Sequence, residues 1–118
     1  MAAMEFSVSH LPAASVIRIT GRWDAFSARE FEQYCAELDS GSPLHCIVLD
    51  VAGVDYISSF GLRSLLNLGK LLHSREGSLH LCGMRPAVRR VFTGSGFASL
   101  FREFPDADSA VAAFGRES

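Results

Sequence analysis

Most side chains that could do chemistry in this sequence are too scattered to form a catalytic or metal site. None of the four histidines has the spacing of a metal-ligand pair; they are His10, His45, His73 and His80. The segment around Ser59 lacks the Gly-x-Ser-x-Gly pattern of a hydrolase nucleophile. Gly94-Ser95-Gly96 lacks the third glycine of a dinucleotide-binding loop. The sequence therefore predicts a protein that is not an enzyme and that needs no metal or cofactor.

Three aspartates could meet at one edge of a sheet. Asp24, Asp50 and Asp55 all lie at or near predicted loops, where carboxylates could hold magnesium. Their spacing shows no ligand pairing, however, and aspartate in such loops ordinarily caps a helix or forms a turn. We expect the cap and turn roles.

The segment Ser58-Ser59-Phe60-Gly61-Leu62 has more specific chemistry, because it is placed where a helix begins. One interpretation is that a serine simply caps the helix, which stabilises it by about 1 kcal/mol. The other is functional: the unpaired N–H groups and partial positive charge of the first turn would tolerate a phosphate on Ser59. Gly61 would then leave the backbone open to another protein. The residues alone leave both interpretations open.

Composition limits the class of protein. The chain has 118 residues, of which 48% are hydrophobic, so it is long enough for one core without disulfides or metals. Its formal net charge of -2 argues against a nucleic-acid binder, and the arginines between Arg85 and Arg90 are interpreted as a solvated helix face. The three cysteines are odd in number and widely spaced, which does not suggest a disulfide framework. Since no signal peptide or membrane span is recognised, we expect a soluble, cytoplasmic protein without membrane insertion.

Hydrophobic periodicity predicts the elements that position the serine segment. Alternating patterns predict two strands that pair as a hairpin, at residues 5–9 and 16–20. After a loop at residues 21–24, Ser27 with Glu30 forms a capping box for a helix that stops near Gly41. The apolar run 46–49 predicts a central strand, followed by a loop at residues 50–56 and a helix that begins at Ser58 or Ser59.

The second half repeats the alternation of strand and helix. A short strand is predicted at residues 78–82, and Pro86 suits the first turn of a third helix. A last edge strand is predicted within residues 100–104, before a final helix capped by Asp106 or Asp108. Strands that alternate with helices imply parallel crossovers. We predict an α/β fold: one domain over residues 1–118, ordered from about 4 to 115, with a mixed four- to five-stranded sheet and about four helices.

With these elements in place, the sequence resembles the STAS family, the sulfate-transporter and anti-sigma-factor-antagonist domain. The resemblance covers nearly the whole chain and includes Gly21-Arg22-Trp23-Asp24, similar to the family's Gly-x-Leu/Phe-Asp loop. It continues through the strand and turn of residues 47–54. Its strongest part is Tyr56-Ile57-Ser58-Ser59-Phe60-Gly61-Leu62-Arg63, where many members read "Y-I-S-S-A-G-L-R" or "F-I-D-S-S-G-L-G".

The resemblance implies an anti-sigma factor antagonist that works as a protein-interaction switch. The unmodified protein would bind an anti-sigma factor, often itself a serine kinase, and so release a sigma factor for transcription. The modified serine of such members corresponds to Ser59, and a phosphatase would reset it. Ser58 stands where the best-known antagonists have aspartate, and Phe60 replaces a small residue. The implied contact residues are Asp24, Ser58, Ser59, Phe60, Gly61 and Arg63.

Alternatives remain at this point. The same fold could serve as a constitutive scaffold or adaptor subunit of a signalling or transport complex without phospho-regulation, with Phe60 as an apolar anchor. A nucleotide could also bind at the helix N-terminus. Arg63 is either a contact residue or a solvated helix residue. The sequence leaves the partner, the signal and the oligomeric state open.

Overall fold

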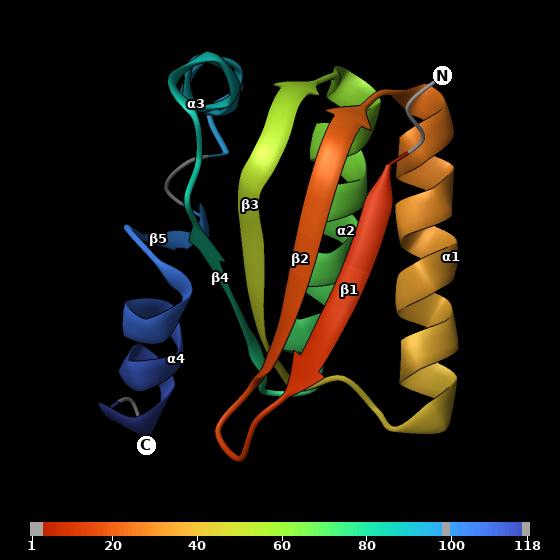
Figure 1. Cartoon of the computed structure of the whole chain (residues 1–118). Coiled ribbons are helices and arrows are strands. Elements are labelled where there is room, and N and C mark those ends of the chain that lie inside the picture. Colours follow the sequence, from red (N-terminus) through yellow and green to blue (C-terminus); the bar gives the residue numbers. More distant parts are fainter. Residues whose placement is uncertain (1–3, 98–99, 117–118) are drawn as a thin grey trace.

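The computed structural model describes residues 4–97 and 100–116, and within them the chain forms a five-stranded mixed sheet with helices on both faces (Figure 1). The elements follow in the order β1 Glu5–His10, β2 Ser15–Trp23, α1 Ala25–Gly41, β3 Cys46–Ile57, α2 Ser59–Ser74, β4 Ser78–Cys82, α3 Pro86–Gly94, β5 Arg102–Phe104 and α4 Ala107–Arg116. The strands lie in sequence order across the sheet. β1 pairs with β2 in antiparallel fashion and the other pairs are parallel. The predicted mixed α/β sheet is confirmed.

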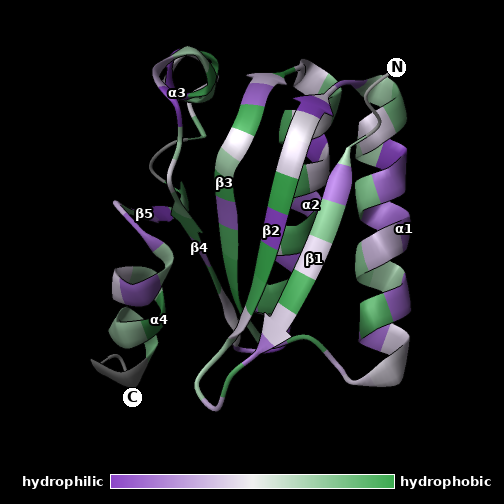
Figure 2. Ribbon diagram, viewed as in Figure 1, coloured by the Kyte–Doolittle hydropathy of each residue, from purple (hydrophilic) through white to green (hydrophobic). Residues whose placement is uncertain are grey.

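The sheet separates two apolar layers. On one face, α1 and α2 bury Phe31 and Leu65 in the main core, together with Trp23 of β2. On the other face, α4 buries Ala110 and Phe114 against smaller strand residues. Figure 2 shows hydrophobic residues along much of β2 and β3, the strands between these layers. Both central strands are therefore held from both sides, which keeps their ends in a defined position.

Strands β2 and β3 are longer than the sequence pattern predicted. The expected loops at residues 21–24 and 50–56 are wrong, because the two strands remain paired as far as Trp23 and Ile57. The pairing shifts register between Arg18 and Thr20 and again beyond Gly21, which has a φ of 117°. Irregular pairing of this kind accommodates glycine and aspartate within a strand, where they otherwise signal a turn.

The helix starts were predicted unevenly. The capping box at Ser27 and Glu30 is wrong: α1 begins at Ala25, and the Asp24 carboxylate caps it by accepting a 2.9 Å hydrogen bond from Ser27 N–H. The start of α2 is confirmed at Ser59. Pro86 does open α3, and Asp106 caps α4 by accepting a 2.8 Å hydrogen bond from Ser109 N–H.

His80 and Asp50 contact other parts of the fold. His80 is fully buried, stacks on Phe114 with ring centroids 3.7 Å apart, and lies 2.9 Å through Nδ1 from the Ala110 carbonyl oxygen. Asp50 accepts a 3.1 Å hydrogen bond from Ala52 N–H. Over residues 4–97 and 100–116, no three histidine, cysteine or acidic side chains are grouped so that they could hold a metal ion. Within the same residues no helix is long and apolar enough to cross a membrane.

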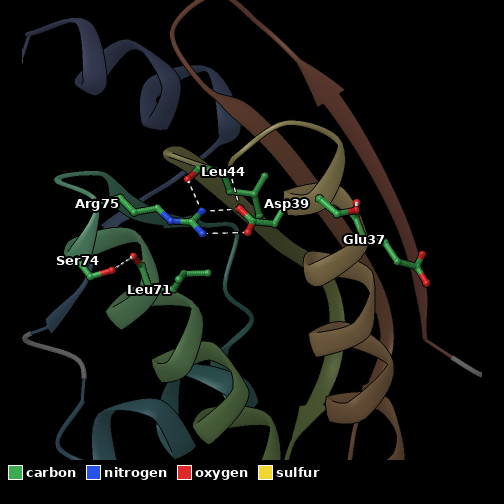
Figure 3. Close-up of polar contacts among 7 residues, drawn as sticks. Glu37, Asp39, Leu44, Leu71, Ser74 and Arg75 are labelled. Atoms are coloured by element: carbon green, nitrogen blue, oxygen red, sulfur yellow. Dashed lines mark hydrogen bonds and ion pairs between the residues drawn. The ribbon is translucent and has the colours of Figure 1, made fainter.

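A polar clip joins the C-terminal ends of α1 and α2 (Figure 3). The Arg75 guanidinium donates two hydrogen bonds to the Asp39 carboxylate, one of them at 2.9 Å to Oδ2, and a third at 3.2 Å to the Leu44 carbonyl. Asp39 also accepts a 2.9 Å bond from Leu44 N–H. These interactions, chiefly the bond from Arg75, lower the pKa of Asp39 from 3.8 to about 2. The clip closes the end of the helix pair that is opposite Ser59.

We predict that Asp39→Asn destabilises the protein at neutral pH and that this deficit disappears in acid. A carboxyl whose pKa is lower in the folded state contributes stability above its unfolded pKa, and the contribution is lost as pH falls through the folded value. The difference in the free energy of unfolding between wild type and variant should therefore be constant above pH 5. It should disappear as the pH falls from about 4 to 2. Urea unfolding followed by fluorescence of Trp23, the single tryptophan, measures it. In an Arg75→Gln background the difference should be much smaller; a difference that persists unchanged to pH 2 would contradict the assignment.

Candidate functional site

Two helices begin side by side at one edge of the sheet. Trp23 and Ile57 are the last paired residues of β2 and β3, and the helix caps Asp24 and Ser58 follow them directly. Because these strands are parallel, the first turns of α1 and α2 both lie at the carboxyl ends of the strands (Figure 1). We call this region the helix-start edge; it consists of residues 22–27 and 56–63.

Ser58 has a structural role in this edge. Its hydroxyl donates a 3.1 Å hydrogen bond to the Trp23 carbonyl and accepts a 3.2 Å bond from Gly61 N–H. Its own N–H donates a 2.9 Å bond to the same Trp23 carbonyl. An aspartate could cap the helix here but, when ionised, could not donate to the carbonyl. Serine at this position therefore ties the start of α2 to the end of β2.

Gly61 is buried, and its close contact is internal. A Cβ atom on Gly61 would lie 2.9 Å from the Trp23 ring and 2.8 Å from Ile57 Cγ1. The Trp23 indole N–H donates a 3.1 Å hydrogen bond to Ser64 Oγ, which in turn donates a 2.8 Å bond to the Gly61 carbonyl. The expectation that Gly61 opens the backbone to another protein is therefore wrong, because the Trp23 ring occupies that space.

Ser59 lies on the outside of the same turn. It is the first residue of α2 and is exposed. Leu62 N–H makes the first helical bond, to Ser58 O at 3.0 Å, and Gly61 N–H bonds the Ser58 hydroxyl, so the backbone N–H groups of Ser59 and Phe60 precede the helical hydrogen bonds. These groups and the helix dipole favour negative charge on Ser59.

Exposed aromatic side chains occur at both helix starts of the helix-start edge. Phe60 is 60% exposed and Phe26 is 67% exposed. Each is the second residue of its helix, and each follows the paired residues Trp23 and Ile57 by three positions. Tyr56 is also exposed, and Arg22 lies over its ring at 4.2 Å from the centroid. Exposed aromatic residues are enriched in protein-binding surfaces.

The two helix starts carry charged residues of opposite sign: Asp24 at the start of α1 and Arg63 in the second turn of α2. Asp24 is half-buried, and the Ser27 N–H that it accepts lowers the pKa of its carboxyl. Arg63 is exposed one turn after Ser59 on α2. A hollow of about 590 Å³ lies beside Ser59 and Arg63. It is also lined by Leu66, Asn67, Lys70 and Phe97. Its charged lining residues are cations, so this side of Ser59 is suited to negative charge.

The structure thus brings together the residues that the sequence singled out, but in unlike settings. Ser59, Phe60 and Arg63 are exposed, Asp24 and Ser58 are half-buried caps, and Gly61 is buried. Two further exposed aromatic residues of this edge, Phe26 and Tyr56, are not among the contact residues expected from the sequence. A signal for Phe26 existed: it is the second residue after its cap Asp24, as Phe60 is after Ser58. That equivalence was hidden because the helix start was placed at Ser27.

Comparison with known proteins assigns this arrangement to a family. A family model described as the STAS domain matches residues 5–110. BtrV of Bordetella bronchiseptica, named as a candidate anti-sigma factor antagonist, is 35% identical over 112 residues, which are 94% of this chain and 95% of BtrV.

Solved structures agree with this match. An anti-sigma factor antagonist from Mycobacterium paratuberculosis has a TM-score of 0.84 at 26% identity, covering 96% of this chain and 95% of that one. The phosphorylated form of the Bacillus cell fate determinant SpoIIAA shares the fold, with a TM-score of 0.71 at 18% identity over 97% of this chain and 100% of its own.

We predict that Gly61→Ala lowers the free energy of unfolding by about 1–3 kcal/mol, as overpacking does. The added methyl meets the Trp23 ring and Ile57, and this cost opposes the higher helix propensity of alanine. Gly94→Ala is the matched control, because nothing lies within 4 Å of a Cβ at this last residue of α3. Urea unfolding measures both variants. Equal stability of the two would contradict the tight contact between Trp23 and Gly61.

Proposed function

The chain belongs to the STAS domain family, and on that premise we propose that it is an anti-sigma factor antagonist regulated by phosphorylation of Ser59. In this proposal the helix-start edge binds an anti-sigma factor that is also a serine kinase, and binding releases a sigma factor for transcription. A phosphatase restores the unmodified serine. The chain itself catalyses no reaction.

The similarity to BtrV over almost the full length of both chains is the observation that carries the proposal. The setting of Ser59 supports the regulatory part. Its neighbours Ser58 and Gly61 are held by Trp23, whereas Ser59 is exposed at the helix end. A kinase could therefore reach the hydroxyl of Ser59 without disturbing the hydrogen bonds that fold the turn.

A phosphate on Ser59 would change the surface without unfolding it. It adds about -1.5 to -2 charge at neutral pH. The partial positive charge of the helix start favours this anion. Arg63, four residues further along the helix, is at the spacing of a favourable ion pair. In a complex, however, the phosphate would have to be desolvated within the interface, which is costly. Phosphorylation should therefore weaken partner binding.

Phe26 and Phe60 support a second candidate function, the constitutive adaptor. Two exposed phenyl rings can anchor a partner through apolar burial, which does not require a phosphorylation cycle. The two functions differ in their response to charge at Ser59. An adaptor keeps its partner when Ser59 is replaced by aspartate, whereas a phospho-regulated antagonist loses it.

We predict that Ser59→Asp weakens binding of the anti-sigma partner by about tenfold or more, equivalent to about 1.4 kcal/mol. Ser59→Ala should bind as wild type but accept no phosphate. The partner is first captured with wild-type bait and identified by mass spectrometry, and affinities are then measured by calorimetry with the purified partner. Ser7→Asp is the matched control, because it adds the same charge at an exposed position of β1.

The kinase step has its own readout. With the cognate kinase and ATP, intact-mass spectrometry should show one phosphate on the wild-type protein and none on Ser59→Ala. If no phosphate is added and Ser59→Asp binds normally, phospho-regulation is excluded. The adaptor function then stands if the phenylalanine variants below lose the partner.

We predict that Phe26→Ala and Phe60→Ala each weaken partner binding by about 1–2 kcal/mol, as exposed aromatic anchors do. Because both side chains are mostly exposed, stability should change by no more than about 0.5 kcal/mol. Leu11→Ala is the control: Leu11 is 46% exposed in the turn between β1 and β2, at the other end of the sheet (Figure 1). Normal affinity of both phenylalanine variants would place the interface elsewhere.

A further inference from the structure

A second hollow lies beside the C-terminal half of α2. It has a volume of about 510 Å³ and is bordered by α2, the start of β4, and Leu100, Phe101 and Arg102. It exists because β5 is short. β5 pairs only with His80–Cys82, so the first residues of β4, Ser78 and Leu79, extend past it and line the hollow. We call this hollow the α2–β4 cavity.

The walls of the α2–β4 cavity are largely apolar. The apolar lining residues are Leu66 of α2, Leu79 of β4, and Leu100 and Phe101. Phe101 reaches the backbone of α2 at Gly69, where a Cβ would lie 2.7 Å from Phe101 Cε1. Glycine inside a helix costs about 1 kcal/mol relative to alanine, so its presence here is explained by the contact with this ring. Leu100 remains 62% exposed.

The charged residues that line the cavity are cations. They are Lys70 of α2 and Arg102 of β5, and none of the described lining residues is acidic. His73 of α2 adds an imidazole ring that can donate a hydrogen bond. Lys70 and His73 are three positions apart on the helix, so they lie on the same face. An apolar hollow with cationic groups is complementary to a ligand that combines a hydrocarbon chain with an anionic head.

We propose that the α2–β4 cavity binds a single free amphiphile with a hydrocarbon chain and a carboxylate head, of the fatty-acid class. The chain lies against Leu66, Leu79 and Phe101, and the carboxylate meets Lys70 and His73. The volume lies within the range of about 300–1,000 Å³ typical of small-molecule pockets and suits one chain rather than a bilayer surface. This proposal goes beyond the proposed function and does not depend on it.

The cavity neighbours the phosphorylation site along α2. The hollow beside Ser59 and the α2–β4 cavity both include Leu66 and Lys70. Ser59, Arg63, Leu66, Lys70 and His73 follow one another at intervals of four and three residues, which places them on one face of the helix. A carboxylate bound at Lys70 would thus contact a residue that also lines the hollow beside Ser59.

The test uses the full chain and sodium decanoate below its micelle concentration. Decanoate should bind with a defined stoichiometry in calorimetry, whereas decanol, which lacks the charge, and butyrate, which lacks the chain, should bind at least about tenfold more weakly. Lys70 is the single lysine of the chain. Reductive methylation with ¹³C-formaldehyde therefore gives one lysine side-chain signal in NMR, which should shift on addition of decanoate. Failure of decanoate to bind overturns the proposal, as does equal binding of the three probes.

Variants assign the binding to this cavity. The double substitution Lys70→Glu and His73→Glu should weaken decanoate binding by about tenfold, because it removes an exposed cation and a hydrogen-bond donor and puts two carboxylates in their place. Arg29→Glu, a charge reversal at an exposed position of α1, should bind decanoate as wild type. Unchanged affinity of the double variant overturns the proposal. So does binding to anionic phosphatidylglycerol vesicles in the absence of binding to free decanoate.

Discussion

The hydrogen bonds and packing between Trp23 and the start of α2 underlie the other features of this structure. The carbonyl of Trp23 accepts hydrogen bonds from both the N–H and the hydroxyl of Ser58, and its indole packs on Gly61. The indole N–H is satisfied by Ser64, so a large side chain is buried without leaving a polar group unpaired. Because Trp23 also ends β2 directly before the cap of α1, one residue sets the positions of two helix starts.

These contacts of Trp23 explain how the helix-start edge can combine a stable turn with an exposed serine. The groups that fold the turn, Ser58 and Gly61, are directed toward Trp23, while Ser59 and Phe60 lie outside. Asp24 performs the same capping role for α1 and leaves Phe26 outside. A surface of this kind can change charge at little cost to the fold, because its exposed side chains are not the ones that fold the turn.

Helix α2 carries Ser59, part of the α2–β4 cavity and the residue before Arg75 on one continuous element. Its first turn presents Ser59, its middle lines the α2–β4 cavity through Leu66 and Lys70, and Arg75, directly after its last residue, is clipped to Asp39 (Figure 3). Tight packing at Leu65, Leu68 and Leu72 holds the helix against the sheet. The exposed face is therefore free to carry polar and charged side chains at positions that core packing does not determine.

Features that depend on neighbouring residues could be predicted from the sequence. Local patterns predicted the alternation of strands and helices, a start of α2 at Ser58 or Ser59, Pro86 in the first turn of α3 and the motif around Ser59. Local patterns misplaced the start of α1, because Ser27 and Glu30 satisfy the capping-box spacing as readily as Asp24 satisfies the cap. They also ended β2 and β3 too early, because glycine and aspartate ordinarily indicate turns.

Contacts between distant segments could not be predicted in this way, because they depend on how the chain folds. Ser58 and Trp23 are 35 residues apart, and their hydrogen bond decides which serine is a structural cap and which is exposed. The same applies to Gly61 beneath Trp23, to Phe26 at the same edge as Phe60, and to the cavity left by the short β5. Such contacts form when the strands pair and the helices pack on the sheet. Periodicity along the chain does not predict which distant side chain will fill a given space.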